Sequence, residues 1–155
     1  MAIAPNTTFT TGAVFTAAQA NAFPFGVVAL TKNTTASQAG ITGVTDLTGM
    51  TATFTAIANR NYKASFHVYA IPTVTNACFS VNLQEGATIL QIGNTNGGVA
   101  NVGTTVTAVW VGTFSAGSHT LKLTGQLTGG STGTIKFEAA SVLPWILVIE
   151  DIGPA

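Results

Sequence analysis

The side chains able to carry out acid–base, nucleophilic or metal chemistry are few in this chain and lie far apart. The 155 residues include two histidines, one cysteine and five acidic residues. His67 and His119 fall on different expected strands, and neither has a cysteine or carboxylate at the spacing of a metal site. Glu150 and Asp151 are neighbours on a strand, so they point to opposite faces and cannot form a paired acid–base site. We therefore expect no metal site and no catalytic carboxylate pair.

The remaining candidate motifs favour structural roles. Ser118 and His119 are strand neighbours that face apart, so they are not a nucleophile and its base. The glycine-rich stretch 93–103 has no lysine and no following helix, so it is not a phosphate-binding loop. A single cysteine cannot form an internal disulfide, and we expect Cys78 to be a small buried apolar residue. We expect no enzyme activity, no catalytic residue and no cofactor.

A few isolated polar residues are assigned by their surroundings in the sequence. His67 lies in the middle of an expected strand, where a hydrogen-bonded or interfacial histidine is favoured over a metal ligand. His119 follows a turn and is expected at the surface. Asp46 and Glu85 are expected to stand alone near turns.

The composition is unusual for its low charge. Hydrophobic residues make up 46% of the chain, which is enough to bury a core, and the length predicts one domain. Charged residues make up only 6%, and the formal net charge is zero, whereas soluble domains average about 25% charged residues. Either other subunits cover much of the surface, or a surface rich in Thr and Asn faces water; we favour the first. The lack of a basic patch disfavours nucleic-acid binding.

Targeting signals are not evident in the sequence. The opening residues MAIAPNTTFT lack a basic region followed by an apolar run, so they are not a secretory signal. The longest apolar stretch, SVLPWILVI, is far shorter than the roughly 20 residues that span a bilayer and contains Pro144. We expect folding in the cytoplasm without membrane insertion.

From Phe25 onwards, apolar residues recur at every second position. This alternation predicts strands with one face in a core. The segments that show it are 50–56, 62–71, 79–83, 89–92, 105–112, 121–124 and 135–139. Gly and Asn between them predict turns at 59–61, 84–87, 93–98, 115–118 and 129–133. The spacing predicts an all-β protein, an antiparallel sandwich or jelly roll.

The last strand departs from the alternation because it is apolar on both faces. In a two-sheet sandwich one face meets the core, so the other must meet something outside the sheet pair. A subunit interface is the simplest candidate, and Glu150 and Asp151 would mark its end. The candidate interface residues are Trp145, Ile146, Leu147, Val148 and Ile149, together with Tyr69.

One short helix is expected before the strands. Thr16 and Gln19 have the spacing of a capping box, and Pro24 disfavours helix at Phe23, so the helix has six or seven residues. Such a short helix is not stable alone and must dock, either on its own domain or on an adjacent subunit or larger assembly. The apolar anchors available for docking are Phe9, Val14, Phe15, Phe23 and Phe25.

Several stretches resemble small structural proteins of tailed bacteriophages, of the minor tail or virion type. These stretches are the opening TTFTTGAVFTAAQANAFPFGVVA, the central RNYKASFHVYA, FSAGSHTLKLTGQ and the terminal ILVIEDIGPA. The second half is also similar to the trimeric jelly roll of the tumour necrosis factor and complement type, although the collagen-like stalk of complement proteins is missing. The resemblance implies a homotrimeric jelly roll over residues 26–155 with an attachment arm over residues 1–25.

Two functions follow from the resemblance and the residues. The first is a non-enzymatic virion protein, a trimeric capsid decoration or tail appendage. Its arm attaches it to other virion proteins, and it assembles in the host cytoplasm. The alternative is a receptor- or glycan-binding module at a tail or fibre tip, whose loops 93–103 and 127–133 recognise the host surface. The few aromatic residues in those loops weigh against the alternative, because carbohydrate sites often use exposed aromatic rings.

Overall fold

The strands account for nearly all the regular structure of the chain. The computed structural model describes residue 14, residues 16–21 and residues 23–155. In this part of the chain one helix precedes ten strands. The elements are α1 (Ala17–Asn21), β1 (Gly26–Asn33), β2 (Ser37–Ile41), β3 (Thr45–Ala56), β4 (Arg60–Pro72), β5 (Ala77–Glu85), β6 (Thr88–Gly97), β7 (Thr104–Thr113), β8 (Gly117–Leu127), β9 (Ile135–Glu138) and β10 (Trp145–Pro154).

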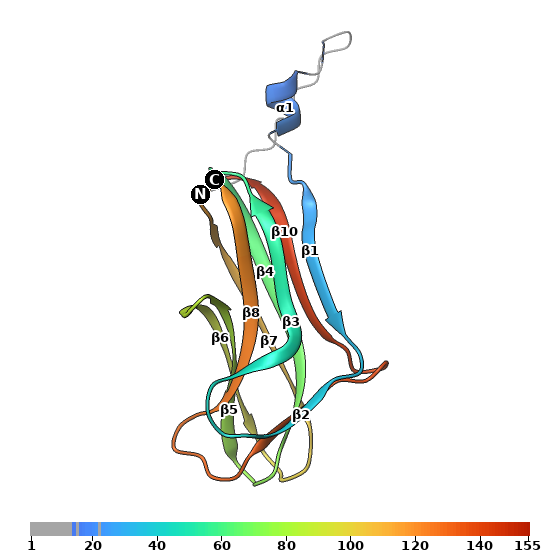
Figure 1. The fold of residues 1–155 in the computed structure, drawn as a ribbon, viewed down its shortest axis with the longest axis vertical. Helices are drawn as coiled ribbons and strands as arrows, with labels where there is room; N and C mark the ends of the chain where they lie inside the picture. The colour runs from blue at the N-terminus through green and yellow to red at the C-terminus, as the bar shows by residue number, and fades with distance from the viewer. Residues whose placement is uncertain (1–13, 15, 22) are drawn as a thin grey trace.

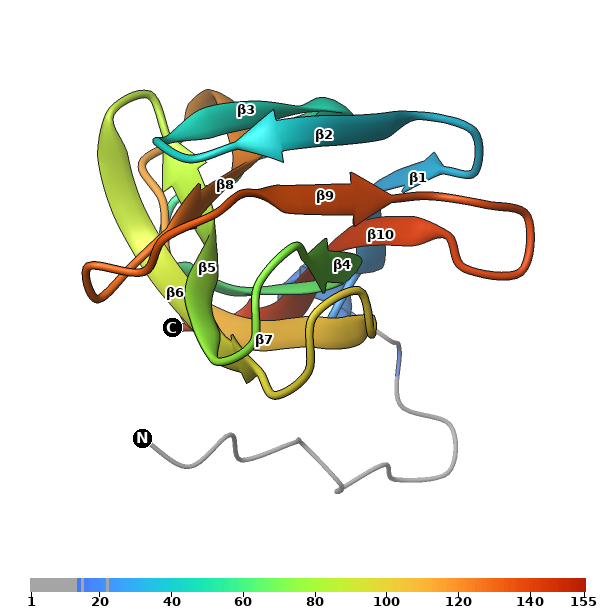
Figure 2. The same cartoon turned by 90° about the horizontal axis from the view of Figure 1, so that it is seen from below.

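The strands form two packed antiparallel sheets. The first sheet has six strands in the order β1-β10-β4-β9-β2, with β7 pairing along β4, and the second has four in the order β3-β8-β5-β6. Consecutive strands such as β3, β4 and β5 alternate between the sheets, which gives the jelly-roll connectivity (Figures 1 and 2). The expected all-β antiparallel jelly roll with one short helix is confirmed.

The core lies between the two sheets and follows the alternation in the sequence. Along β4 every second residue is buried over the whole strand. Inward-facing side chains of the two sheets interdigitate in this way because successive strand residues point to opposite faces. The largest side chains with less than 2% exposure are Trp145, Tyr62, Phe79 and Phe137.

The turn expected at 93–98 is wrong, because residues 93–97 complete β6. Gly93 and Gly97 are buried strand residues that let other side chains approach closely. A Cβ at Gly97 would lie 2.2 Å from a Pro72 ring carbon, and one at Gly93 would lie 2.9 Å from Val106. The glycines therefore serve close packing, and the chain turns only after Gly97.

The short helix begins as expected. The backbone N–H of Thr16 donates to the Gln19 side chain at 2.8 Å, and the N–H of Gln19 donates to the Thr16 hydroxyl at 3.3 Å, so the capping box is confirmed. The helix spans five residues, slightly fewer than expected. It lies beyond the end of the two sheets (Figure 1). Of the expected apolar anchors, Phe9 and Phe15 lie outside the described residues.

Candidate functional site

The last strand places its apolar residues on two different surfaces. Trp145, Leu147 and Ile149 are fully buried in the core. Ile146 and Val148 lie on the opposite, outer face of the six-stranded sheet and are only half-buried. Of the six candidate interface residues, the structure therefore places these two and Tyr69 where another molecule can reach them.

The strands on either side of β10 extend this apolar surface. In the sheet register Leu30 of β1 lies opposite Val148, Val148 opposite Ser65 of β4, and Ser65 opposite Val109 of β7. Directly paired residues point to the same face, so these side chains form one row across four strands. Leu30 is 61% exposed and Val109 is 54% exposed. This row could not be predicted from the sequence, because its members lie on four separate segments of the chain.

A second row lies beside the first and contains an ion pair. Val27, Glu150, Lys63 and Val111 follow one another across β1, β10, β4 and β7. The Lys63 ammonium lies 2.6 Å from a Glu150 carboxylate oxygen, so the two charges offset each other. Val27 and Val111 are more than half exposed. We call the two rows together the outer apolar face.

A shallow groove continues the outer apolar face towards the β9–β10 connection. It has a volume of about 390 Å³, and its lining includes His67, Pro144, Ile146 and Val148. His67 is half-buried and lies opposite Ile146 on the neighbouring strand, so this histidine belongs to the outer face and not to a metal site. Among the described residues, no group of three His, Cys, Asp or Glu side chains could hold a metal ion.

Tyr69 lies further along β4, where its ring packs closely on Gly103, the residue before β7. A Cβ at Gly103 would lie 2.0 Å from the Tyr69 hydroxyl oxygen, so the ring fits only because residue 103 is glycine. Tyr69 is half-buried.

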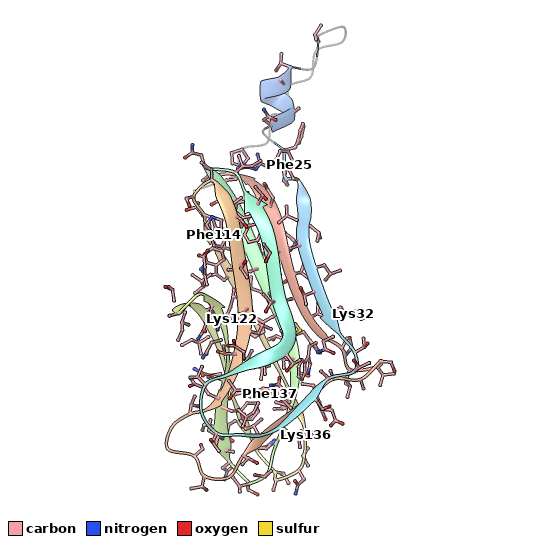
Figure 3. The ribbon with its side chains drawn as sticks, viewed as in Figure 1. Phe25, Lys32, Phe114, Lys122, Lys136 and Phe137 are labelled. Carbon is pink, nitrogen blue, oxygen red and sulfur yellow. The ribbon has the colours of Figure 1, made fainter. Side chains whose placement is uncertain are left out.

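The base of the N-terminal segment is held by a buried ion pair. The Arg60 guanidinium and the Asp151 carboxylate form two hydrogen bonds, one of them 2.7 Å long, and both residues are at most 5% exposed. The same guanidinium donates to the backbone carbonyls of Asn21 and Phe23, each at 2.6 Å. It also lies 3.9 Å from the centre of the Phe25 ring, within the range of a cation–π contact. We call these contacts the arm clasp (Figure 3, Phe25).

The arm clasp fixes the charge state of its acidic partner. Burial alone would raise the pKa of Asp151, but hydrogen bonds from Arg60, Gly153 and Phe25 outweigh it and lower the pKa below the ordinary value of 3.8. The hydrogen bond that Arg60 donates to Asp151 raises the pKa of Arg60 in turn. Both groups therefore stay charged. The C-terminal end of the helix at Asn21 is held to the sheets by this ion pair.

An unexpected side-chain cluster joins Glu85, His119 and Ser115. His119 Nδ1 lies 2.6 Å from a Glu85 carboxylate oxygen, and Nε2 lies 2.9 Å from the Ser115 carbonyl. The Ser115 hydroxyl is 3.5 Å from Nε2, so the residue types match those of a catalytic triad. An ionised carboxylate and a carbonyl only accept hydrogen bonds, so these two contacts favour a ring protonated on both nitrogens. In that charged form the ring cannot take a proton from serine.

Three expectations about isolated charges are wrong for the same reason. His119 is half-buried, with 13% of its side chain exposed, and Glu85 is its partner. Asp46 pairs with Lys122 at 2.8 Å. Each pair joins residues at least 34 positions apart, because the order of strands in the second sheet brings them together. The hydrogen bond between His119 and the Glu85 carboxylate, which accepts it, raises the pKa of His119 above its ordinary value of 6.5.

The two stretches proposed as ligand-binding loops approach each other in the structure. Residues of 93–103 and of 127–133 line one groove with Cys78, which is half-buried. The backbone N–H of Thr128 donates to the Cys78 carbonyl at 2.9 Å, and the Cys78 N–H donates to the Ser131 hydroxyl at 2.8 Å. Within the described ranges no helix is long and apolar enough to cross a membrane.

Comparisons with known proteins support the fold. No protein-family model and no curated protein sequence matches the chain. Among solved structures, the Eiger TNF of S. frugiperda has a TM-score of 0.55 and 9% identity, covering 84% of this chain and 94% of its own. Murine APRIL has a TM-score of 0.52 and 9% identity, covering 81% and 99%. The tripod from the baseplate of bacteriophage Tuc2009 has 18% identity over 99% of this chain and 80% of its own, but a TM-score of only 0.44. The first two establish a jelly roll of the TNF type.

Proposed function

We propose that the chain is a non-enzymatic structural subunit that associates with copies of itself through the outer apolar face. The observation that carries the proposal is the group of exposed apolar side chains on the outer face of β1, β10 and β7, on either side of Ser65 and Lys63 of β4. Exposed apolar side chains gathered on one face and bordered by polar residues mark sites of association. Burying one Leu or Val side chain contributes about 1.5–3 kcal/mol.

A second copy of the chain is the partner that fits best. The formal net charge is zero, so copies do not repel one another at long range. The only ion pair within the two rows, Lys63 with Glu150, is already internally neutralised. The similarity of the sequence to the trimeric jelly roll of the tumour necrosis factor and complement type favours a homotrimer over other assemblies.

The proposed location of this trimer is a bacteriophage virion. The support is the sequence resemblance to small structural proteins of tailed phages, as a capsid decoration, a minor tail protein or a tail appendage. Residues 1–25 would form the attachment arm and residues 26–155 the body. The helix that projects from the arm clasp is consistent with an arm that contacts other virion proteins.

Two charged substitutions on the outer apolar face test the association. Leu30→Glu and Val109→Glu put an unpaired carboxylate into the proposed interface, where burial of a charge is costly. Each variant should sediment as a folded monomer. Val142→Glu is the matched control, because Val142 is 83% exposed in the β9–β10 connection and is not a member of either row. If both face variants keep the oligomeric state of the control, the outer apolar face is not the interface.

A further inference from the structure

A second surface of the molecule forms a groove that the proposed function does not use. It has a volume of about 550 Å³ and lies on the outer face of the four-stranded sheet, over β5, β6 and β8. Its lining includes Cys78, Ser80, Ile92, Asn94, Asn96 and Gln126. The register places Ser80 opposite both Asn94 and Gln126, so the groove runs across three paired strands and not over a mobile tip.

The lining carries no charge and combines polar groups with a larger carbon surface. Its polar groups include the amides of Asn94, Asn96 and Gln126 and the hydroxyl of Ser80, and its carbon surface includes Ile92 and Cys78. Gln126 donates to Ser80 at 3.2 Å, which orients both groups at the floor of the groove. Asn94 and Asn96 are exposed, and their amides make no hydrogen bond to the part of the chain that the structure describes.

Two further polar side chains lie beside the groove without a partner. Asn82 and Thr124 lie opposite each other on β5 and β8, on the same face of the sheet, and both are fully buried. The Asn82 amide and the Thr124 hydroxyl have no hydrogen-bond partner among the described residues. Unsatisfied buried polar groups are costly and rare, so their position next to an open polar groove needs an explanation. Asn82 also lies opposite Ile92, which lines the groove.

We propose that this groove binds a neutral saccharide. A sugar presents hydroxyl groups to amides, which both donate and accept hydrogen bonds, and a C–H surface to carbon side chains. A phosphate or a carboxylate ligand would need a cation, and the groove has none. The groove is complete in one copy of the chain, so the proposal does not rest on self-association.

The chemistry of the groove also sets the expected strength of binding. The lining has no aromatic ring on which a sugar could stack, so one groove should bind weakly. Linked copies raise the apparent affinity 10²–10⁴-fold without new contacts when the ligand is a long or surface-bound glycan. This gain, unlike the site itself, depends on the proposed assembly.

A glycan array with matched variants tests the site. The probes are immobilised neutral and acidic glycans, and the protein is the full chain. Neutral glycans should give the hits, and the double variant Asn94→Ala/Asn96→Ala should reduce their signal at least tenfold while remaining folded. Thr55→Ala is the control, because Thr55 is an exposed residue of the same sheet on β3, away from the groove. The absence of neutral hits, hits confined to acidic glycans, or an unchanged signal in the double variant would each overturn the proposal.

The single cysteine provides an independent reading of the same groove. N-ethylmaleimide can react only with Cys78, and the adduct would fill the groove. Alkylated protein should no longer bind the glycans that the array identifies. In the reverse experiment, a soluble form of such a neutral glycan should slow the alkylation of Cys78 in proportion to the fraction of grooves that it occupies. Binding that survives complete alkylation would contradict the assignment. In monomeric variants of the outer apolar face, the glycan should still protect Cys78 from alkylation. This result distinguishes a failure of the groove from a failure of self-association.

Discussion

Two ion pairs that join β4 to β10 should differ greatly in their effect on stability. Arg60 and Asp151 are buried, whereas Lys63 and Glu150 are partly exposed. Arg60→Ala leaves a buried carboxylate without its partner, which should lower the free energy of unfolding by about 3–5 kcal/mol. Lys63→Ala should lower it by less than about 1 kcal/mol. Urea unfolding of both variants measures the difference, and equal losses would contradict the role given to the arm clasp.

The same clasp should make the protein sensitive to acid. The pKa of Asp151 is lower in the folded chain than its ordinary value of 3.8. A lowered pKa contributes stability that is present above pH 3.8 and is lost as the pH falls through the folded pKa. The loss below pH 3.8 should be smaller in Asp151→Asn, because that variant cannot be protonated. Unfolding curves of both proteins between pH 2 and pH 5 test this, and parallel curves would count against it.

The pair of His119 with Glu85 predicts a change of stability in the opposite pH direction. The raised pKa of His119 contributes stability that is fully present below pH 6.5 and is lost as the pH rises through the folded pKa. Glu85→Gln removes the charged acceptor, so its stability should change less with pH between 6 and 9. Denaturant unfolding across this range is the measurement. A wild-type curve that stays flat would show that the ring is not protonated in the folded state.

These residue contacts could not be predicted from the sequence. Glu85 and His119 are 34 positions apart and meet only because β5 pairs with β8. Arg60 and Asp151 are 91 positions apart and meet because β4 pairs with β10. A sequence shows which residues carry charge, but strand order decides which charges become partners.

At the scale of elements, the edge strand β6 makes its tightest contact with the other sheet at Gly97. A methyl group at Gly97 would collide with Pro72, whereas at Gly98 nothing lies within 4 Å. Gly97→Ala should therefore destabilise the protein by about 1–3 kcal/mol, the usual cost of overpacking. Gly98→Ala should leave stability unchanged or slightly raised, because alanine restricts the unfolded chain. Thermal unfolding of the two variants tests the account, and equal melting temperatures would contradict it.

The elements themselves were largely predictable, and the error at β6 shows the limit. Alternating residues identified β3, β4 and β7 because one face of each strand meets the core. The Gly and Asn residues of β6 instead suggested a turn. Their true role depends on Pro72, Val106 and Phe66, which approach β6 from the other sheet and are invisible to local pattern. The capping box at Thr16 was predictable because all its contacts are local.

At the scale of the whole molecule, the arm and the body should have separable roles. Deletion of residues 1–24 removes the helix and two acceptors of Arg60 but retains the Arg60–Asp151 pair and the body. The truncated chain should fold and keep its oligomeric state, yet fail to join virus particles. Co-purification with particles tests this, with the full chain carrying Thr55→Ala as a control. If the truncated chain is incorporated normally, the arm is not the attachment.

The sequence predicted an interface on the outer side of the last strand, but it did not predict which residues form that surface. The double-sided apolar pattern of β10 indicated a covered outer face, but three of its five residues fill the core. The partners that extend the surface, Leu30, Val109 and Val111, come from strands whose neighbours the sequence could not assign.

The molar mass of the full chain in solution is the most direct test of self-association. Sedimentation equilibrium at micromolar concentration measures it without reference to shape. We expect about three times the chain mass of 15.7 kDa. A single species at 15.7 kDa, folded and with Leu30 and Val109 in contact with water, would contradict the account.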